Sequence, residues 1–534
     1  MNNNSLLDPS SVRTSIEGTS LFRNSFIVTG SDRRVISQFL LDAEEEMKGY
    51  EVEINQLRTA MHLLETKKSG LKKTMDRGRS LLSPVHRLPT ETLTEIFSHA
   101  CKHNCLSHSL PPQTIKLSRV CGRWWEVIRS APKLWSSIII WFSFRRRKLL
   151  ALEKLVRLFL DRSATQPLYL QLCFFNMDQD SNGMSSILHV LHDHAARWQV
   201  LDLMGFTPCF PSPPRQHGFP ALQEVILIGI HSTPPNTLLS LFRNAQSLRT
   251  FDVSGNLLEN FQFDIPFHQI KTLVVRNPPP RMLSAFIEHL ARFPALETLY
   301  INEIDYPPLK QDNATHHLSQ TITSVTFEFE DQRAMDFMFR ALTLPSLTSL
   351  QVGGTHHAAL YGRWSVWQGE AVADFLSRSS CSVTSLCLKN VPITDVQTIS
   401  LLQLIPTLAS LDVEEIPRPN KTDRAGSFPN RIITQPFLQR LTVEHEVFRP
   451  SHPFLPLLND ITITMREDDT VERELFNAVA SRWIPDTYEA EKIGVKSLKS
   501  VAIRLEREGK SKDRQWLKSL ECFRVAGLSL RVDT

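Results

Sequence analysis

The sequence predicts an α/β repeat protein, in which a long N-terminal helix and a small helical domain precede a solenoid of parallel strands. Three observations support this fold class. Apolar residues recur with a heptad period near the N-terminus, and a segment of about 50 residues has the three- and four-residue spacing of helices. In the remainder, the unit apolar-x-x-apolar-x-apolar returns about every 25 residues, a period typical of solenoids.

The composition sets the class of protein. At 534 residues the chain allows two or three domains, and 42% hydrophobic and 22% charged residues fit a globular protein. The net charge of +4 is too small to indicate a nucleic-acid partner, and no apolar run approaches the roughly 20 residues of a membrane span. Eight cysteines without paired spacing, and no secretory signal, predict an intracellular protein, cytoplasmic, nuclear or both.

The N-terminal part divides at residue 31. Residues 1–31 are rich in Asn, Ser and Thr and are predicted to be disordered. Residues 32–83 are predicted to form a coiled-coil helix, which Pro84 ends. One heptad position carries Ile36, Ala43, Tyr50, Leu57, Leu64 and Leu71, and the other carries Leu40, Met47, Ile54, Met61, Lys68 and Met75. Three arrangements remain open for this helix: pairing with a second copy as a homodimer, packing on the C-terminal part of the same chain, or a single exposed helix.

The helical domain is predicted over residues 84–140. A Leu-Pro pair opens an amphipathic helix with Leu93, Ile96 and Phe97 on one stripe, and a second stripe begins at Leu117. So small a segment cannot bury its many large apolar side chains alone. It therefore needs another surface, on the rest of the chain or on a partner.

This segment resembles the F-box, the adaptor-docking module of cullin-type ubiquitin ligases. The family pattern is Leu-Pro-x-Glu-x-Leu-x-x-Ile-Phe, then Leu-x-x-Val-Cys-x-x-Trp, then Pro-x-Leu-Trp. The resemblance implies three helices that bind a Skp-type adaptor, and through it a cullin–RING ligase. The adaptor-binding candidates are Leu88, Pro89, Leu93, Ile96, Phe97, Leu117, Val120, Trp124, Leu134 and Trp135. The spacer 102–112 is expected to be a surface loop, and an ordinary helical hairpin is the alternative for the whole segment.

Residues 141–534 carry the recurring unit and are predicted to form the solenoid. Each unit supplies a short strand whose apolar side points inward, and each depends on its neighbours for burial. The copies begin at Trp198, Leu222, Leu248, Ile270, Leu296, Ile322, Leu347, Val383, Leu408, Leu438, Leu458, Leu498 and Val525. The region resembles the leucine-rich repeats that commonly follow an F-box. The asparagine usual at the strand end occurs only at Asn256, so an irregular solenoid is expected; a β-sandwich is the alternative.

In such a solenoid, the strand residues between the buried positions face the concave side. Tyr and Arg among them are favoured anchors of protein interfaces. The substrate-binding candidates are Arg276, Tyr300, Glu328, Gln351, Lys389, Glu414 and Arg440. Their mixed charges favour a folded protein as the partner.

Enzyme motifs are missing from the sequence. It contains no P-loop, no Gly-x-Ser-x-Gly elbow and no His-Glu-x-x-His helix. The cluster His99, Cys101, His103, Cys105 and His108 offers zinc ligands, but its spacing does not supply two separated ligand pairs, so neither a metal nor another cofactor is expected. The resemblance implies a non-catalytic substrate receptor of a ubiquitin ligase; a ligase-independent scaffold is the alternative.

Overall fold

In the computed structural model, the chain divides into two compact units, Met1–Leu93 and Thr94–Thr534. The described residues are 13–14, 28–107, 111–142, 146–174, 182–205, 218–229, 241–255, 257, 265–305, 316–355, 357–358, 362–416, 430–445, 453–466, 471–506 and 515–533.

The first unit contains one helix of 52 residues, α3 (Gly30–Leu81), followed by the 3-10 turn η1 (Pro84–Arg87). A reciprocal cap begins α3: the Asp32 amide donates to Thr29 Oγ1 at 3.3 Å, and the Thr29 amide donates to Asp32 Oδ2 at 3.1 Å. The helix ends three residues before Pro84. The predicted long helix is confirmed, whereas its coiled-coil pairing stays a prediction. Most of the predicted disordered segment, 1–31, lies outside the described residues.

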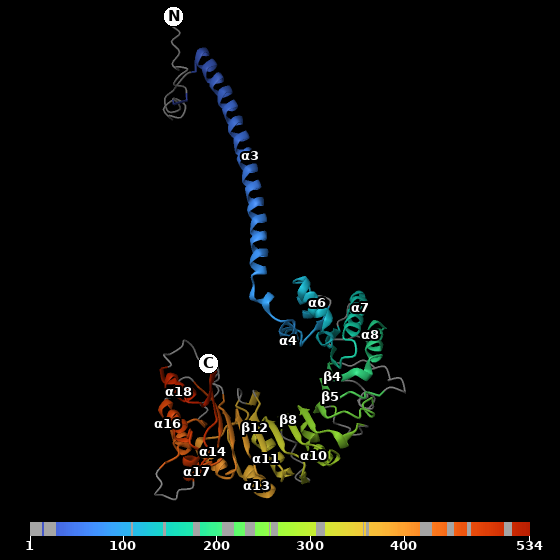
Figure 1. Cartoon of the computed structure of the whole chain (residues 1–534), viewed down its shortest axis with the longest axis vertical. Helices are drawn as coiled ribbons and strands as arrows, with labels where there is room; N and C mark the ends of the chain where they lie inside the picture. Colours follow the sequence, from blue (N-terminus) through green and yellow to red (C-terminus); the bar gives the residue numbers. More distant parts are fainter. Residues whose placement is uncertain are drawn as a thin grey trace. The chain divides into compact units, whose positions relative to one another are not determined.

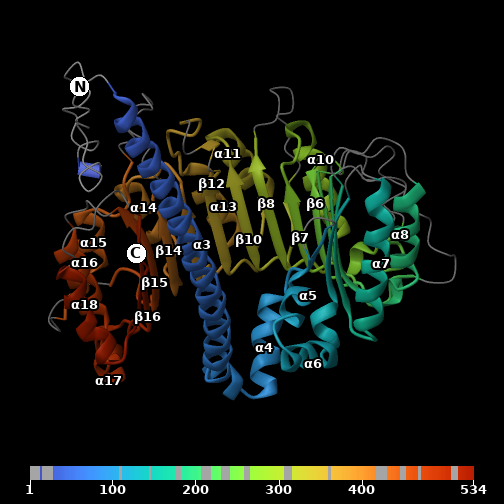
Figure 2. The same ribbon diagram turned by 90° about the horizontal axis from the view of Figure 1, so that it is seen from above.

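The second unit is built on one parallel sheet, which has fifteen strands among the described residues and is not closed. Figure 2 shows its strands running side by side in chain order. The strands are β1 (Cys105–Leu106), β2 (Ser137–Phe142), β3 (Leu168–Phe174), β4 (Trp198–Gly205), β5 (Glu224–Ile228), β6 (Thr250–Ser254), β7 (Thr272–Arg276), β8 (Thr298–Ile304), β10 (Ser324–Phe329), β12 (Ser349–Gly354), β13 (Ser385–Lys389), β14 (Ser410–Glu414), β15 (Asp460–Arg466), β16 (Ser500–Glu506) and β17 (Ser529–Asp533). A second small sheet pairs β9 (His317–Leu318) with β11 (Leu342–Thr343).

Helices connect many of the strands and lie on the outer face of the curved sheet, as α10, α11 and α13 show in Figure 1. They are α7 (Arg146–Arg162), α8 (Asn182–His192), α10 (Leu283–His289), α11 (Gln332–Ala341), α13 (Glu370–Ser379), α14 (Asp395–Gln403), α15 (Gln435–Leu441), α16 (Glu472–Arg482), α17 (Thr487–Ile493) and α18 (Gln515–Val525). Alternate strand residues, such as Val225 and Leu227 of β5, are fully buried. Among the helices described, none is long and apolar enough to cross a membrane.

The predicted solenoid of parallel strands is confirmed, and the β-sandwich alternative is wrong because the neighbouring strands are parallel and many are joined by helices. Two predicted copies are also wrong. In the last one, Val525 lies in α18 and is 84% exposed, and the pairing with β16 aligns Leu530 with Val501 and Val532 with Ile503, two residues later than predicted. The copy that begins at Leu438 lies in α15, where Thr434 caps the helix and Phe437, Leu438 and Leu441 are buried at helical spacing. A proline at the first turn of α15 favours this helix.

The ends of several strands share one backbone conformation. A left-handed residue follows several strands, including Asn277 after β7 (φ 47°) and Asn390 after β13 (φ 53°). Gly205 closes β4 at φ 86°, and a Cβ there would lie 2.0 Å from the carbonyl oxygen of Phe174. Asn256 lies outside the described residues. Short polar residues that tolerate this conformation thus turn the chain from the sheet toward the helices.

A buried arginine joins the last repeats. Arg482 of α16 is 0% exposed, and its guanidinium donates to the carbonyl oxygens of Leu441, Phe454 and Leu455, the last at 3.0 Å. Burial lowers the pKa of Arg482 to about 10, so it remains charged at neutral pH. The charge is therefore compensated by carbonyl dipoles drawn from α15 and from the chain that leads into β15.

Candidate functional site

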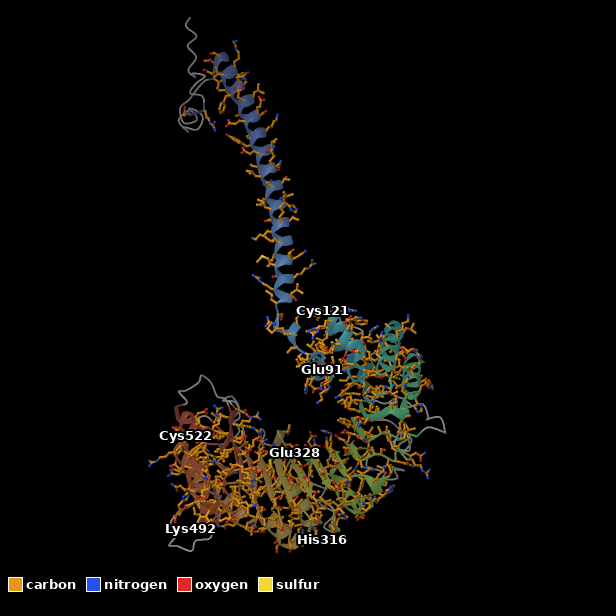
Figure 3. All side chains as sticks on the ribbon, viewed as in Figure 1. Glu91, Cys121, His316, Glu328, Lys492 and Cys522 are labelled. Carbon is orange, nitrogen blue, oxygen red and sulfur yellow. The ribbon has the colours of Figure 1, made fainter. Side chains whose placement is uncertain are left out.

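The segment that resembles an F-box folds as three short helices and a 3-10 turn. These are α4 (Thr90–Ala100), α5 (Gln113–Ser118), α6 (Gly122–Ser130) and η2 (Pro132–Trp135). The stripe that begins at Leu117 is not one continuous helix, because Cys121 has an extended backbone and separates α5 from α6. Figure 3 labels Cys121 in this segment.

Aromatic side chains hold these helices together and attach them to the sheet unit. Phe97 of α4 meets Trp124 of α6 edge to face, with ring centroids 4.8 Å apart. Trp135 donates from its indole nitrogen to the carbonyl oxygen of Ile128 at 2.9 Å, and its ring packs against Phe159 of α7 at 5.0 Å. Trp124 thus joins α6 to α4, and Trp135 joins η2 to α6 and α7.

A buried polar centre joins α4, α5, η2 and β2. The Asn104 amide donates to the carbonyl oxygens of Cys101 and Leu134 at 3.0 and 2.9 Å, and Asn104 Oδ1 accepts from the Thr114 hydroxyl at 2.7 Å. The Asn104 carbonyl accepts from the amide of Ile139 at 2.9 Å. Both Asn104 and Thr114 are 0% exposed. The spacer expected as a surface loop is therefore partly interior, because it carries this centre and β1.

The predicted adaptor-binding residues divide by accessibility. Leu93, Phe97, Leu134 and Trp135 are at most 3% exposed, so they build the interior of the segment and are not contact residues in this conformation. Leu88, Leu117 and Trp124 are half-buried. Pro89 is exposed, as are Ile96 at 47% and Val120 at 58%.

Trp125 is a surface residue that sequence analysis missed. It lies on α6 and is 41% exposed. Successive residues of a helix point about 100° apart, so while Trp124 faces Phe97 its neighbour cannot face the same interior. The Trp-Trp pair on an amphipathic helix was the available signal. Large exposed apolar residues of this kind are frequent anchors of protein interfaces.

The other candidate surface is the inner face of the sheet. Arg276 of β7 forms a two-bonded ion pair with Asp252 of β6, at 2.8 and 2.7 Å, and the Tyr300 hydroxyl of β8 donates to Glu328 Oε1 of β10 at 2.9 Å. Figure 3 shows Glu328 on the inner side of the curved sheet. Three of the predicted substrate-binding residues are thus already engaged within the chain. Burial and this hydrogen bond raise the pKa of Tyr300 to about 12.

The remaining predicted substrate-binding residues have different positions. Gln351, Lys389 and Glu414 are half-buried on β12, β13 and β14, as expected. Arg440 does not lie on a strand, because the residues around it form α15; its guanidinium stacks over Phe454 at 5.2 Å. The prediction that Arg440 belongs to the inner face is therefore wrong.

Asp202 of β4 is an inner-face carboxylate that sequence analysis did not select. It is 6% exposed, and Gln171 Nε2 of β3 donates to its Oδ2 at 2.9 Å. Its Oδ1 is buried and has no hydrogen-bond partner among the described residues. Burial, with a smaller effect from the charge of Asp252, raises the pKa of Asp202 to about 6. The sequence gives no sign of this burial or of the raised pKa, since the aspartate occupies an ordinary inner-face position of its strand.

Serine and threonine line the beginning of the inner face. Thr250, Thr272 and Thr298 are register partners, and the row continues across the later strands as Ser324, Ser349, Ser385 and Ser410. Because these hydroxyl side chains are small, this edge of the inner face is polar and projects little above the backbone. Together with the charged pairs, they make a surface able to form hydrogen bonds with a protein.

The structure provides no metal centre among the residues it describes: no group of three or more His, Cys, Asp or Glu side chains could hold an ion there. Cys101 is 2% exposed, and His108 lies outside the described part. Cys387 on the inner face is a thiol whose pKa burial and nearby Asp412 raise to about 12.

Comparison with known proteins adds no family to these observations. A scan against protein-family models finds no match to the chain. A search of the curated proteins likewise finds no similar sequence.

Proposed function

We propose that this chain is the substrate-recognition subunit of a Skp–cullin–F-box ubiquitin ligase. The helical segment docks a Skp-type adaptor, and the inner face of the sheet binds a target protein. The chain itself is not catalytic. It acts by proximity, since tethering a target raises the effective concentration of its lysines near the ubiquitin-charged enzyme.

The observation that carries the proposal is the accessibility of Ile96, Val120 and Trp125. The interior of the helical segment is already filled by Leu93, Phe97 and Trp135, yet these three large apolar residues remain 41–58% exposed. They lie within the residues that resemble an F-box or directly beside them. Because exposed apolar residues are anchors when buried at an interface, they suit the adaptor that the resemblance implies.

The contacts between the helical segment and the sheet support separate roles for them, adaptor docking and target binding. Asn104 and Thr114 bridge to Leu134, and Trp135 packs on α7, so the exposed residues of α6 share one compact unit with the inner face. A target held on that face would keep a defined orientation toward the adaptor. By fixing the orientation of the target, the receptor would direct ubiquitin transfer to a particular lysine.

The second candidate function is a ligase-independent scaffold. The observation in its favour is α3, which is long and carries exposed apolar residues suited to assembly with another chain. Recruitment of cullin distinguishes the two functions. A receptor recruits cullin together with the adaptor, whereas a scaffold does not.

The test is co-purification of the full chain with a Skp-type adaptor and a cullin. The variant Ile96→Asp/Val120→Asp places two charges on the proposed contact surface and should abolish adaptor binding. The matched control is Val396→Asp on α14, where the valine is 68% exposed and lies outside the helical segment. Circular dichroism checks that each variant remains folded.

We expect the wild type and the control to co-purify with stoichiometric adaptor and cullin. We expect the double variant to co-purify with neither. Adaptor without cullin would favour the scaffold. Wild-type chain that binds no adaptor would overturn both docking and the ligase function.

A further inference from the structure

The helix α3 exposes an apolar seam along its length. The spacing from Leu40 to Ala43 assigns Leu40 and its heptad equivalents to position a, and Ile36, Ala43 and their equivalents to position d. Nine of these side chains are between 47% and 63% exposed: Leu40, Met47, Tyr50, Ile54, Leu57, Met61, Leu64, Leu71 and Met75. Leu41, Val52 and Leu63 are also exposed but lie off the seam. The long apolar seam favours a helix as its occupant.

The charges on α3 are separated along its axis. Residues 42–53 contain six acids and one lysine, a net charge of −5, whereas residues 58–79 contain seven bases and two acids, a net charge of +5. A parallel pair of identical helices would place like halves together. An antiparallel pair would place each acidic half against a basic half, which is the favourable arrangement.

The seam itself accepts the antiparallel arrangement in full register. Residues whose numbers sum to 111 then form the core layers, and no seam residue lacks an opposite. The layers are Leu40 with Leu71, Met47 with Leu64, Ile54 with Leu57, Met61 with Tyr50, Lys68 with Ala43 and Met75 with Ile36. Lys68 faces a small alanine with Glu44 and Glu46 nearby. In a parallel pair, Lys68 would instead meet Lys68 of the second copy in the seam.

The flanking e and g positions lead to the same orientation. Antiparallel pairing brings Glu46 to Lys67 and Glu51 to Arg58, with one repulsive contact between Glu44 and Glu65. Parallel pairing would bring Glu46 to Glu51 and Lys67 to Lys72, both repulsive, with one attraction between Glu53 and Arg58. The contacts that Glu46 makes within the chain, with Tyr50 and with Arg13 at 3.5 Å, lie at the helix surface.

We propose that α3 pairs with α3 of a second copy as an antiparallel coiled coil, with Glu46 of each copy against Lys67 of the other. This dimer does not depend on the proposed ligase function. Each chain leaves the paired helices at an opposite end, so the two copies are separated by up to the helix length of about 78 Å.

The test is the dimer dissociation constant of the full chain, measured by sedimentation equilibrium. Glu46→Lys and Lys67→Glu each turn an attractive contact into a repulsive one in both halves of the dimer, so each should raise the dissociation constant about tenfold. The double variant Glu46→Lys/Lys67→Glu should return to within about twofold of wild type, as should an equimolar mixture of the two single variants. Parallel pairing predicts that each single variant tightens the dimer, because Glu46→Lys would then set a positive charge against Glu51, and Lys67→Glu a negative charge against Lys72.

The matched controls are Glu45→Lys and Lys73→Glu, which make the same charge changes at f positions outside the seam and should leave the constant within about twofold. Single variants that tighten the dimer, a dimer insensitive to them, or a wild-type chain that stays monomeric would each overturn the proposal. Adaptor co-purification would be unchanged in all of these cases, which separates this failure from failure of the receptor function.

Discussion

The side-chain amide of Asn104 donates a 2.9 Å hydrogen bond to the carbonyl oxygen of Leu134, thirty residues further along the chain. Asn104 is 0% exposed and Leu134 is 2% exposed, so neither group has water as a substitute partner. The oxygen of the same side-chain amide accepts a hydrogen bond from the Thr114 hydroxyl. One side chain thus fixes the end of α4, the beginning of α5 and the turn η2.

Replacing Asn104 by leucine should lower the free energy of unfolding by about 2–4 kcal/mol, because several buried polar groups lose their partner. Urea unfolding followed by tryptophan fluorescence measures this. Lys102→Leu, at an exposed position two residues away, should change stability by less than about 0.5 kcal/mol. Equal effects of the two substitutions would show that the buried centre contributes nothing.

Surface and core residues of the helical segment should respond differently to truncation. Phe97→Ala removes a ring that is 1% exposed and packs on Trp124, so it should cost about 3–5 kcal/mol of stability. Trp125→Ala removes a ring that is 41% exposed and should cost less than about 1 kcal/mol while still weakening adaptor binding. Thermal unfolding alongside adaptor titration separates the two effects. Trp125→Ala that unfolds the segment would contradict its assignment to the surface.

Arg482→Met should destabilise the last repeats by about 3–5 kcal/mol, since the carbonyl oxygens of Leu441, Phe454 and Leu455 would remain buried without their donor. Hydrogen exchange followed by mass spectrometry should show the loss as faster exchange in α15 and β15. Arg473→Met, at an exposed position on the same helix, is the matched control and should be near neutral. A stable Arg482→Met protein would mean that the methionine repacks the site.

Asp202→Asn should stabilise the protein at pH 7 but not at pH 4. The pKa of Asp202 is raised to about 6, so the folded chain binds its proton more tightly than the unfolded chain, and the stability associated with that proton is lost as pH rises from about 4 through about 6. Asparagine does not ionise, so its advantage over wild type should grow across this window to about 1–3 kcal/mol. Urea unfolding at several pH values measures the difference. An advantage of equal size at pH 4 and pH 7 would contradict the prediction.

The large-scale organisation could be predicted from sequence because periodicity reports which side chains are buried. The heptads indicated α3, and the recurring unit located β4 to β8 and most later strands. β3 was missed because a register shift between Leu168 and Tyr169 removes a residue from the lead of the unit, so its three-residue spacing fails. Leu438 was misassigned because Leu438 and Leu441 satisfy both the strand unit and the helical spacing.

The candidate sites were less predictable. Motif matching selected Leu93 and Phe97 together with Ile96, but it could not divide them into interior and surface, since one amphipathic helix supplies both. Asn104, Asp202 and Arg482 escaped because their partners are backbone carbonyls or side chains on other elements. Such partners are set by three-dimensional packing and leave no local pattern.

Among the described residues, each strand of the large sheet pairs with the strands that precede and follow it in that sheet's chain order. Insertion or loss of one unit would therefore lengthen or shorten the arc without removing a contact between distant repeats. The inner-face residues, which alternate with the buried residues along each strand, can also be substituted one strand at a time. Substitutions on the inner face would thus change which surfaces it could contact, while the helices at the start of the sheet kept their own contacts unchanged.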